Sequence, residues 1–395
     1  MKSSYKIIWV IWFTLVPILL FAQKKEQQTG DTIQYKTLIP ETKQGLLKNM
    51  SMIANMRFTG RSEFVDGENT QTRFVNEQFR LEFRGMVHEK VYFRFRDRYT
   101  RSQDPQSIDN ISRSVDLAYI RVDVSDKFNF SAGKMCADWG AYEFDYNPID
   151  IYEYSDIIEY ADNFLTGVGA SYKFHPKHQA TLQVLDSRTK TFEELYGQQP
   201  NITESKAPLA FIANWRGSFF DGKFNTIWSY AIHNEAESTN MSYIALGNQI
   251  KLNKFTIEYD FKWSSEDLDR TGIISETVPD DLYPYALENT LYVGHWLHLY
   301  YRLNPKWNFA FVGMYDTADW KADGIPGKTE DRFRTALGFI PTIEYYPFEN
   351  LNLRFFINYV GRDYDYSDYA TSATGAVDYS TGRIAIGFVS PLGIF

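Results

Sequence analysis

Three arginines stand at every second position in the segment "VYFRFRDRYT". Arg94, Arg96 and Arg98 alternate with Phe93 and Phe95. In a β-strand successive side chains point to opposite faces, so this segment has one cationic face and one aromatic face. Like charges this close repel one another, and the repulsion is relieved where water solvates the row or carboxylates neutralise it. The spacing therefore indicates a polar surface that attracts anions or forms ion pairs.

The segment "FRLEFRGMV" repeats the pattern. Arg80 and Arg84 alternate with Phe79, Leu81 and Phe83. If the two segments pair as neighbouring strands, their arginines line one wall, and a water-filled space beside that wall would draw anions in. The residues predicted to form this basic ladder are Arg80, Arg84, Arg94, Arg96 and Arg98. The alternative is a ladder that is salt-bridged to acidic neighbours and has no role in selectivity.

The segment 137–165 has the opposite charge. It holds eight Asp and Glu residues and no Lys or Arg, and aromatic residues such as Trp139 and Tyr142 would let it pack against a wall. If it folds inward opposite the ladder, the two produce a transverse field that orients dipolar solutes. The carboxylates predicted to act in this way are Asp138, Glu143, Asp145, Asp150, Glu153 and Asp156. The alternative is an acidic surface loop that binds divalent cations or the sugar layer.

Residues for enzyme chemistry are sparse. Among the six histidines, His295 and His298 lie on opposite faces of one expected strand, and His175 and His178 flank a tight turn. No zinc spacing, phosphate loop or nucleotide fingerprint occurs. Cys136 is the one cysteine after the leader, so we expect no intramolecular disulfide. We predict no catalytic residue, no cofactor, no bound metal and no nucleic acid partner.

The first 48 residues differ from the rest of the chain. Lys2 and Lys6 precede an apolar run from residue 7 to residue 21, and "LLFAQ" offers Ala22 at a cleavage position. This pattern predicts a secretory signal peptide over residues 1–22, which is excluded from fold reasoning. Residues 23–48 are polar and aperiodic, so we expect a periplasmic N-terminal tail there.

Apolar and polar residues alternate in almost every segment after residue 49. In "KFTIEYDFKWS", for example, Phe255, Ile257 and Tyr259 share one face, and Glu258 and Asp260 share the other. Aromatic residues make up 17% of the chain, yet the mean hydropathy is −0.39. The alternation predicts sixteen strands, near 50–60, 73–87, 91–100, 114–124, 127–136, 166–175, 179–188, 208–220, 223–233, 241–252, 254–264, 290–303, 307–318, 332–346, 351–364 and 381–395.

The gaps between these strands alternate in length. The odd gaps hold 12, 13, 29, 19, 7, 25, 13 and 16 residues, and the even gaps hold one to four, with turn sequences such as "SD", "HPK" and "NPK". Transmembrane barrels have this asymmetry of short periplasmic turns and long external loops, and hydrocarbon tolerates no unpaired strand edge. We therefore predict an all-β fold, a transmembrane antiparallel β-barrel of about 16 strands over residues 49–395, in the outer membrane and in contact with its lipid.

Two segments have a less regular pattern. In 114–124, Val115 and Leu117 compete with Ile120 and Val122 for the apolar face. At the end of the chain, Phe395 resembles the terminal aromatic of outer-membrane barrels but has the opposite parity to the preceding apolar residues. We expect a bulge at Ser390–Pro391 to reset the register there.

Charge is distributed unevenly along the chain. The net charge is −9, of which 137–165 carries −8 and 265–289 carries −6, so the remainder is +5. Of that remainder, +4 lies in the leader and the polar tail. The barrel wall is therefore close to neutral, with its cations grouped locally.

Three segments carry a resemblance to a known family. "FRLEFRGMVHEKVYFRFRDR", "LAYIRVDVSDKFNFSAGKM" and "WGAYEFDYNPIDIYEYSD" resemble the phosphate-selective porin O/P family of Gram-negative outer membranes, most clearly over residues 73–175. The resemblance implies a sixteen-stranded channel for small anions, usually a homotrimer, guided by the arginine ladder and narrowed by a third external loop folded into the lumen. That family also uses basic residues on this loop, whereas 137–165 has none. We therefore expect a pore for small hydrophilic solutes with an anion preference broader than phosphate.

Two other function classes compete with a pore. The first is a barrel with a blocked lumen that acts as an adhesin or as a structural subunit of a larger assembly, with the long loops at 265–289 and 365–380 carrying the function. The second is an outer-membrane enzyme, for which the sequence offers no paired Ser and His on neighbouring strands.

Overall fold

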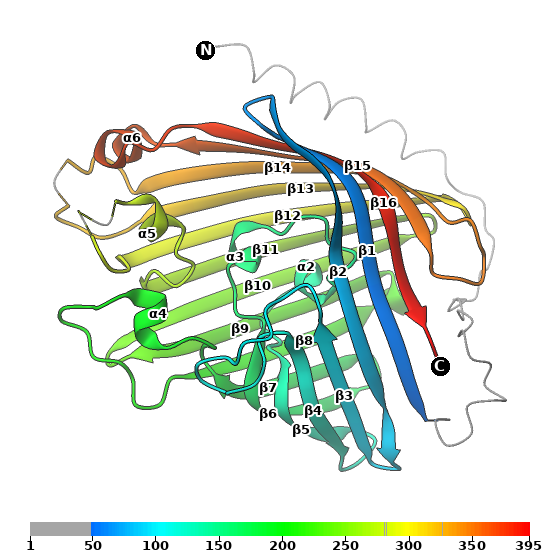
Figure 1. The fold of residues 1–395 in the computed structure, drawn as a ribbon. Coiled ribbons are helices and arrows are strands. Elements are labelled where there is room, and N and C mark those ends of the chain that lie inside the picture. Colours follow the sequence, from blue (N-terminus) through cyan, green and yellow to red (C-terminus); the bar gives the residue numbers. More distant parts are fainter. Residues whose placement is uncertain (1–48, 280, 282, 326) are drawn as a thin grey trace. The chain divides into compact units, whose positions relative to one another are not determined.

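The computed structural model describes residues 49–395 except 280, 282 and 326. The expected signal peptide and most of the expected tail lie outside these residues. Sixteen antiparallel strands pair in chain order and close into a barrel (Figure 1). The barrel closes where β1 pairs with β16, from Ile53↔Gly393 to Val65↔Thr381. The predicted fold class is confirmed.

Several strands in the first half of the chain are shorter than the other strands of the barrel. β3, β4, β5 and β7 have eight or nine residues each, whereas β2 has 21 and β12 has 17. The strands are β1 (Met50–Val65), β2 (Glu68–His88), β3 (Val91–Arg98), β4 (Val115–Asp123), β5 (Phe128–Cys136), β6 (Phe164–His175), β7 (His178–Asp186), β8 (Leu209–Phe219), β9 (Phe224–Ala236), β10 (Thr239–Leu252), β11 (Phe255–Leu268), β12 (Glu288–Asn304), β13 (Trp307–Trp320), β14 (Arg332–Tyr345), β15 (Arg354–Tyr366) and β16 (Tyr379–Gly393).

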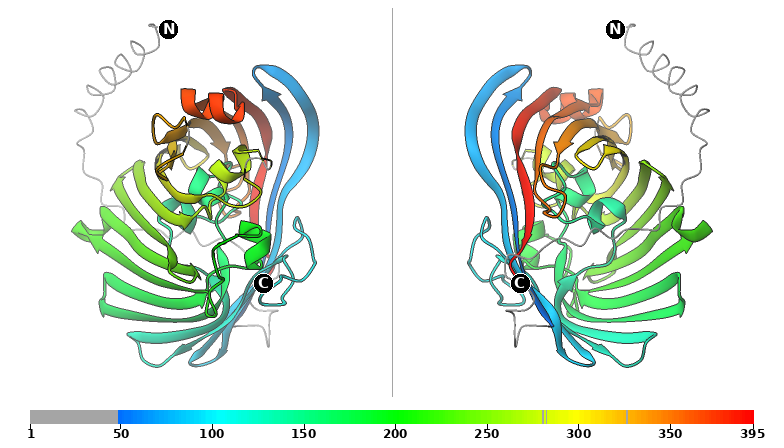
Figure 2. Two further views of the ribbon diagram at one scale, coloured as in Figure 1. Left: turned by 90° about the vertical axis from the view of Figure 1, so that its left-hand side faces the viewer. Right: turned by 90° about the vertical axis from the view of Figure 1, so that its right-hand side faces the viewer.

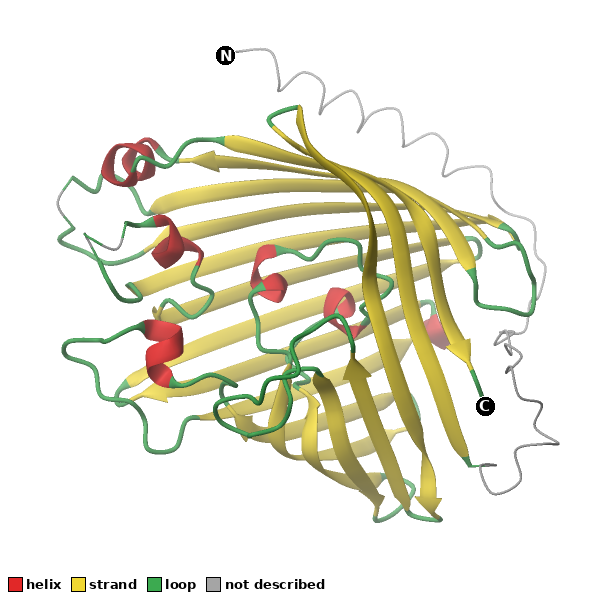
Figure 3. Ribbon diagram, in the orientation of Figure 1, coloured by secondary structure: helices red, strands yellow, loops and turns green. Residues whose placement is uncertain are grey.

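Helical segments lie in the connections between strands (Figure 3). They are α2 (Tyr142–Asp145), α3 (Asp156–Glu159), α4 (Phe192–Tyr196), η4 (Phe220–Gly222), α5 (Ile273–Thr277) and α6 (Asp368–Thr374). α4, α5 and α6 lie at one end of the barrel (Figure 1). The short turns that join β8 to β9, β10 to β11 and β12 to β13 lie at the other end. No helix among the described residues is long and apolar enough to cross a membrane.

Two connections expected to be long are tight turns, so those predictions were wrong. β1 and β2 continue to the turn Asp66–Gly67, and β9 and β10 continue to Glu237–Ser238. The backbone pairing of these strands continues through polar residues, beyond the segments in which apolar and polar residues alternate. Asp66 and Gly67 both have positive φ, 49° and 83°, as a two-residue hairpin turn of the primed type requires. In Figure 2 this blue hairpin faces the green strands across the lumen.

The structure shows which side chains face outward in the two irregular segments. Ile120 on β4 is 46% exposed on the outer face, whereas Val115 and Leu117 line the lumen. The expected bulge at Ser390–Pro391 is wrong, because the pairing of β16 with β1 runs through both residues without a register shift. The apolar side chains of β16, such as Ile386, point outward, as lipid requires.

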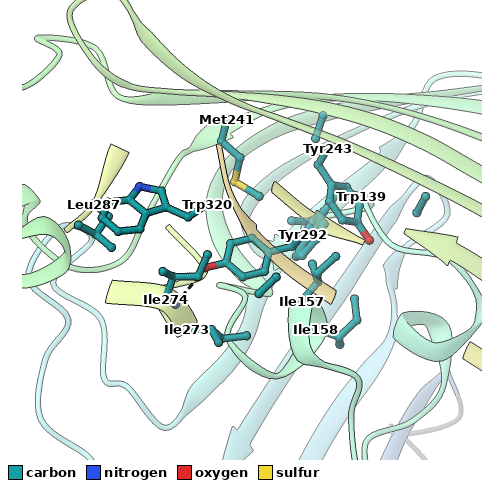
Figure 4. Close-up of a cluster of buried hydrophobic side chains, with 14 of the residues drawn as sticks. Trp139, Ile157, Ile158, Met241, Tyr243, Ile273, Ile274, Leu287, Tyr292 and Trp320 are labelled. Atoms are coloured by element: carbon teal, nitrogen blue, oxygen red, sulfur yellow. Dashed lines mark hydrogen bonds between the residues drawn. The ribbon is translucent and has the colours of Figure 1, made fainter. Parts of the chain in front are cut away.

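One half of the lumen is filled by side chains. Trp139 and Ile157 from the connection between β5 and β6 pack with Tyr243 of β10 and Tyr292 of β12 (Figure 4). The rings of Trp139 and Tyr243 meet edge to face at 4.4 Å between centroids. Gly247 permits the loop to lie close to β10, because a Cβ there would lie 2.8 Å from the Ala141 Cβ. The open space inside the barrel therefore lies beside the wall that the first strands of the chain form.

Candidate functional site

The basic ladder lies on two neighbouring strands. The pairing of β2 with β3 sets Arg80 opposite Arg98 and Arg84 opposite Arg94, with Arg96 opposite Glu82. All five arginines line one cavity of about 1290 Å³ inside the barrel. The outward residues of the same strands, such as Phe95 opposite Phe83, form the other face. The two sequence segments thus form one wall, as their alternation predicts.

A buried carboxylate neutralises part of the ladder. Asp116 lies at a register shift between β3 and β4, where Arg96 pairs with Leu117 and the next pair is Asp97 with Val115. This bulge leaves Asp116 unpaired, and a bulge can re-aim a side chain. The carboxylate is fully buried among three guanidiniums: Arg98 Nη2 at 2.5 Å, Arg96 Nε at 3.2 Å and Arg80 Nε at 3.4 Å.

A second carboxylate, that of Glu82, binds the arginines at the other end of the ladder. Glu82 accepts from Arg94 Nε at 3.0 Å and from Arg84 Nη1 at 3.4 Å, and Arg96 Nη1 lies 4.0 Å away. Among the described residues, five guanidiniums therefore share two carboxylates. Their exposure differs, because the side chains of Arg84, Arg94 and Arg98 are 45%, 28% and 17% exposed, whereas those of Arg80 and Arg96 are 2% and 7% exposed.

Cations outnumber anions among the residues that line the cavity, although buried carboxylates behind the lining, such as Asp116, neutralise several of these cations. Twelve Lys and Arg line it against nine Asp and Glu. The cations that our sequence reasoning did not single out are Arg57, Lys90, Arg101, Arg121, Lys134, Lys173 and Arg216. Arg121 could have been found from its shared parity with Leu117 and Tyr119, but that required knowing which face of β4 points inward.

The predicted third loop, 137–165, folds into the barrel up to the start of β6 at Phe164. Asp260 of β11 accepts from the backbone N–H groups of Tyr142 and Glu143 at 3.1 and 2.8 Å, which holds α2 against the far wall. Glu143 accepts from the Ser155 backbone and hydroxyl at 2.6 and 2.7 Å and forms a buried ion pair with Lys262. The prediction that this segment folds inward is confirmed.

The other loop carboxylates also have basic partners on β8 to β16. Asp138 and Asp145 both pair with Arg216 of β8, at 2.7 and 2.8 Å. Asp150 pairs with Arg354 of β15 at 2.5 Å.

The second half of the loop is bound in the same way. Glu153 pairs with Arg383 of β16 at 2.9 Å. Asp156 lies between Arg334 and Arg362, at 2.5 and 2.6 Å. Within the part of the chain that the structure describes, none of the six carboxylates forms a salt bridge with a ladder arginine. The carboxylates thus attach the loop to strands outside the ladder, from β8 round to β16.

Tyrosines form much of the loop surface that shares the cavity with the ladder. Tyr146, Tyr152 and Tyr154 line it, together with Asp145 and Glu153. The Tyr146 hydroxyl donates to Glu258 at 2.8 Å. Burial raises the pKa of Tyr154 to about 12, so its phenol is neutral at physiological pH. The channel thus runs between a cationic wall and a loop surface of aromatic residues and carboxylates.

The second external loop, 99–114, also reaches the lumen. Asp109 accepts from Lys134 Nζ on β5 and from the Thr166 hydroxyl on β6, both at 3.0 Å. Arg101 and Gln106 of this loop line the cavity. This loop narrows the channel from the side of the ladder.

The histidines are dispersed as the sequence predicts. His298 contacts Glu258 at 2.9 Å on the inner face, and His295 contacts the Tyr259 hydroxyl at 2.8 Å among exposed residues. Within the described residues no group of three or more His, Cys, Asp or Glu is placed to hold a metal ion.

A family model describes this arrangement. The model for "phosphate-selective porin O and P" matches residues 55–388. The chain belongs to this family. It is therefore a porin of the outer membrane, and family and fold point to a channel and not to an enzyme. A search of curated proteins finds no match.

Solved outer-membrane channels share the fold of this porin. The channel DcaP of Acinetobacter baumannii matches with a TM-score of 0.57 at 10% identity, covering 86% of this chain and 96% of that chain. A loop-deletion form of OmpT of Vibrio cholerae matches at 0.54 and 10%, covering 86% and 98%. Salmonella typhi OmpF, in complex with daunomycin, matches at 0.52 and 12%, covering 86% and 98%.

Proposed function

We propose that this porin passes small hydrophilic solutes by passive diffusion and prefers anions. The observation that carries the proposal is the shared neutralisation of the ladder, in which five guanidiniums face two carboxylates along one cavity. The excess positive charge is solvated by the water of the channel and raises the local concentration of anions.

The two sets of site residues have different proposed roles. Arg84, Arg94 and Arg98, whose side chains are the most exposed of the ladder, guide the anion. Arg80 and Arg96 keep Asp116 in place and thereby position the others. The carboxylates on the third loop fix the width of the channel, because each is held by a basic residue of a barrel strand outside the ladder. We also propose that residues 1–22 are a signal peptide and 23–48 a periplasmic tail.

We propose that the anion preference of the channel is not restricted to phosphate. The third loop has no Lys or Arg, and its contribution to the cavity consists mainly of aromatic residues and carboxylates, such as Tyr146, Tyr154 and Asp145. An anion in the channel therefore meets cations on one side only, which gives attraction without the enclosure that a tight phosphate site needs.

Planar bilayer recording tests the pore. We expect stepwise conductance in chloride. When inorganic phosphate replaces part of the chloride at equal ionic strength, the conductance should fall by less than about twofold, because water and salt screen the attraction between phosphate and a single basic wall. A saturating block by phosphate would show a tight phosphate site instead. The absence of conductance steps would favour the adhesin or structural subunit.

We further propose a homotrimer. Asp97 has the outward parity of β3, opposite Leu81 and next to the bulge at Asp116, and its carboxylate forms no salt bridge with a described residue. A carboxylate facing hydrocarbon without a partner is unfavourable, and a neighbouring subunit would cover it. One channel of similar fold, OmpT of Vibrio cholerae, has a trimer form.

Cross-linking of the protein in native membranes tests the trimer. We expect the main cross-linked band at three times the mass of the mature chain, which is the 46.1 kDa chain without its signal peptide. Asp97→Arg places a bulky cation on this wall and should shift the band to the monomer, whereas Glu237→Arg, in an exposed external turn, should leave the trimer intact. A monomer band in the unsubstituted protein would contradict the proposal.

A further inference from the structure

The strands that follow the ladder line the cavity with uncharged polar groups. Among the described residues that β5, β6 and β7 contribute to the cavity lining, none is Asp or Glu. In contrast, Gln78 is the only uncharged residue that the described strands β2 and β3 contribute. Five hydroxyl and amide residues near the short turns of β5 to β7 form a surface that we call the neutral wall: Asn129, Ser131, Ser171, Gln179 and Thr181.

Strand register joins the neutral wall to the cationic side of the cavity. Arg121 of β4 pairs with Ser131 of β5. Farther round the barrel, Ser171 of β6 pairs with Asn129 on one side and with Thr181 of β7 on the other. The hydroxyl and amide groups therefore form one continuous surface, and this surface begins directly beside a guanidinium.

The side chains of the neutral wall keep hydrogen-bonding capacity for a solute. Asn129 and Ser131 form no side-chain hydrogen bond with a described residue, and both are partly exposed. The hydroxyls of Ser171 and Thr181 share one hydrogen bond at 2.9 Å, and Gln179 Nε2 lies 3.4 Å from the Thr181 hydroxyl. A hydroxyl has one donor and two acceptor sites, and a primary amide has two of each, so every member can form a further hydrogen bond.

A guanidinium and an aromatic ring border the other side of the neutral wall. Arg216 of β8 pairs in register with Gln179 and binds Asp145 of the third loop at 2.8 Å. Phe144, the neighbour of Asp145 in the loop, lines the same cavity. An aromatic ring offers an apolar surface against which the C–H face of a sugar ring can pack. The groups that surround this part of the channel therefore match a solute that has a charge, hydroxyls and an apolar face.

We propose that the neutral wall favours sugar acids of hexose size among the anions that the ladder attracts. A hexuronate has one carboxylate, which suits a guanidinium, and ring hydroxyls that donate and accept as the neutral wall does. Arg121 gives two of its five N–H donors to Asp123 and keeps the others. Cross-strand partners have Cβ atoms about 5 Å apart, so a carboxylate at Arg121 brings the sugar hydroxyls to Ser131. This inference rests on the proposed anion channel and names its class of solute.

Planar bilayers with different anions on the two sides test the proposal. Potassium glucuronate, or potassium cyclohexanesulfonate as an anion of similar size without hydroxyls, faces KCl across the membrane. The reversal potential then gives the permeability of each organic anion relative to chloride. Both organic anions have one negative charge, so the ratio of their permeabilities reports the hydroxyls. We expect glucuronate to be about tenfold more permeant, as two net hydrogen bonds would give.

Two hydroxyl pairs of the same geometry supply the test variant and its control. Ser171→Ala/Thr181→Val removes the pair in the neutral wall and should lower the permeability ratio about fivefold. Ser62→Ala/Thr72→Val removes a pair with the same 2.9 Å spacing in the external hairpin of β1 and β2, and should leave the ratio unchanged. Ser171→Thr/Thr181→Ser keeps both hydroxyls and should keep the ratio. Equal permeability of the two anions in the unsubstituted porin, or equal falls in the two hydroxyl-free variants, would overturn the proposal.

The ladder variant separates this proposal from that of the anion channel. Replacing Arg84, Arg94 and Arg98 by alanine should weaken the attraction for both organic anions alike, so their ratio should stay near tenfold. A ratio near one in that variant would assign the discrimination to the ladder and refute the role of the neutral wall. A porin that conducts chloride and passes both organic anions equally contradicts this proposal alone, whereas a protein without conductance steps contradicts the channel as well.

Discussion

Replacing Arg84, Arg94 and Arg98 together by alanine is expected to abolish most of the anion preference of the channel. These side chains are the exposed part of the ladder, and their loss removes three positive charges from the cavity wall. A unit charge acts on an ion roughly 8 Å away in water with about 0.5 kcal/mol. Three charges therefore lower the local concentration of anions by about tenfold and raise that of cations by a similar factor, so the ratio of anion to cation permeability falls by at least about tenfold.

The reversal potential in a KCl gradient measures this ratio. Low salt is preferable, because screening at high salt hides the effect. The triple lysine variant should retain the preference, since it keeps the charge. Arg73→Ala is a matched single control, because Arg73 lies on the same strand but in the exposed external hairpin, with 47% of its side chain exposed. An unchanged reversal potential in the triple alanine variant would assign the ladder a purely structural role.

Glu143→Ala is expected to release the third loop from the far wall and to enlarge the channel. The side chains of Glu143 and Lys262 are 0% and 1% exposed, and Ser155 contacts both. Removing one member of a buried ion pair leaves an uncompensated charge and costs roughly 3–5 kcal/mol. That cost is borne by the docked loop, because the barrel strands keep their own hydrogen bonds.

Single-channel recording measures the release as a higher conductance with larger current noise. Glu143→Leu/Lys262→Met removes both charges with side chains of similar volume and should restore the quiet, smaller channel. The thermal unfolding transition of the barrel should be retained in Glu143→Ala, because the strand pairing is intact. If Glu143→Ala and the unsubstituted porin conduct alike, the loop is held by its apolar contacts instead, among them Trp139 against Tyr243.

The sequence alone determined the architecture and the ladder. Lipid outside and water inside impose a period of two on every strand, and this period is local, so it can be counted in segments such as "VYFRFRDRYT". The same alternation placed all five ladder arginines on the inner wall. The charge of 137–165 and its aromatic content also indicated a loop that packs, and it does.

The tertiary structure decided the partners. The sequence predicted that Asp156 would face the ladder, but its partners are Arg334 and Arg362, nearly 200 positions away in the sequence. Asp116 joins the ladder only through a bulge, and a bulge shifts parity in a way that the alternation of neighbouring residues does not reveal. Which carboxylate meets which guanidinium depends on how a closed barrel brings distant strands and an inserted loop together, and no local pattern encodes that closure.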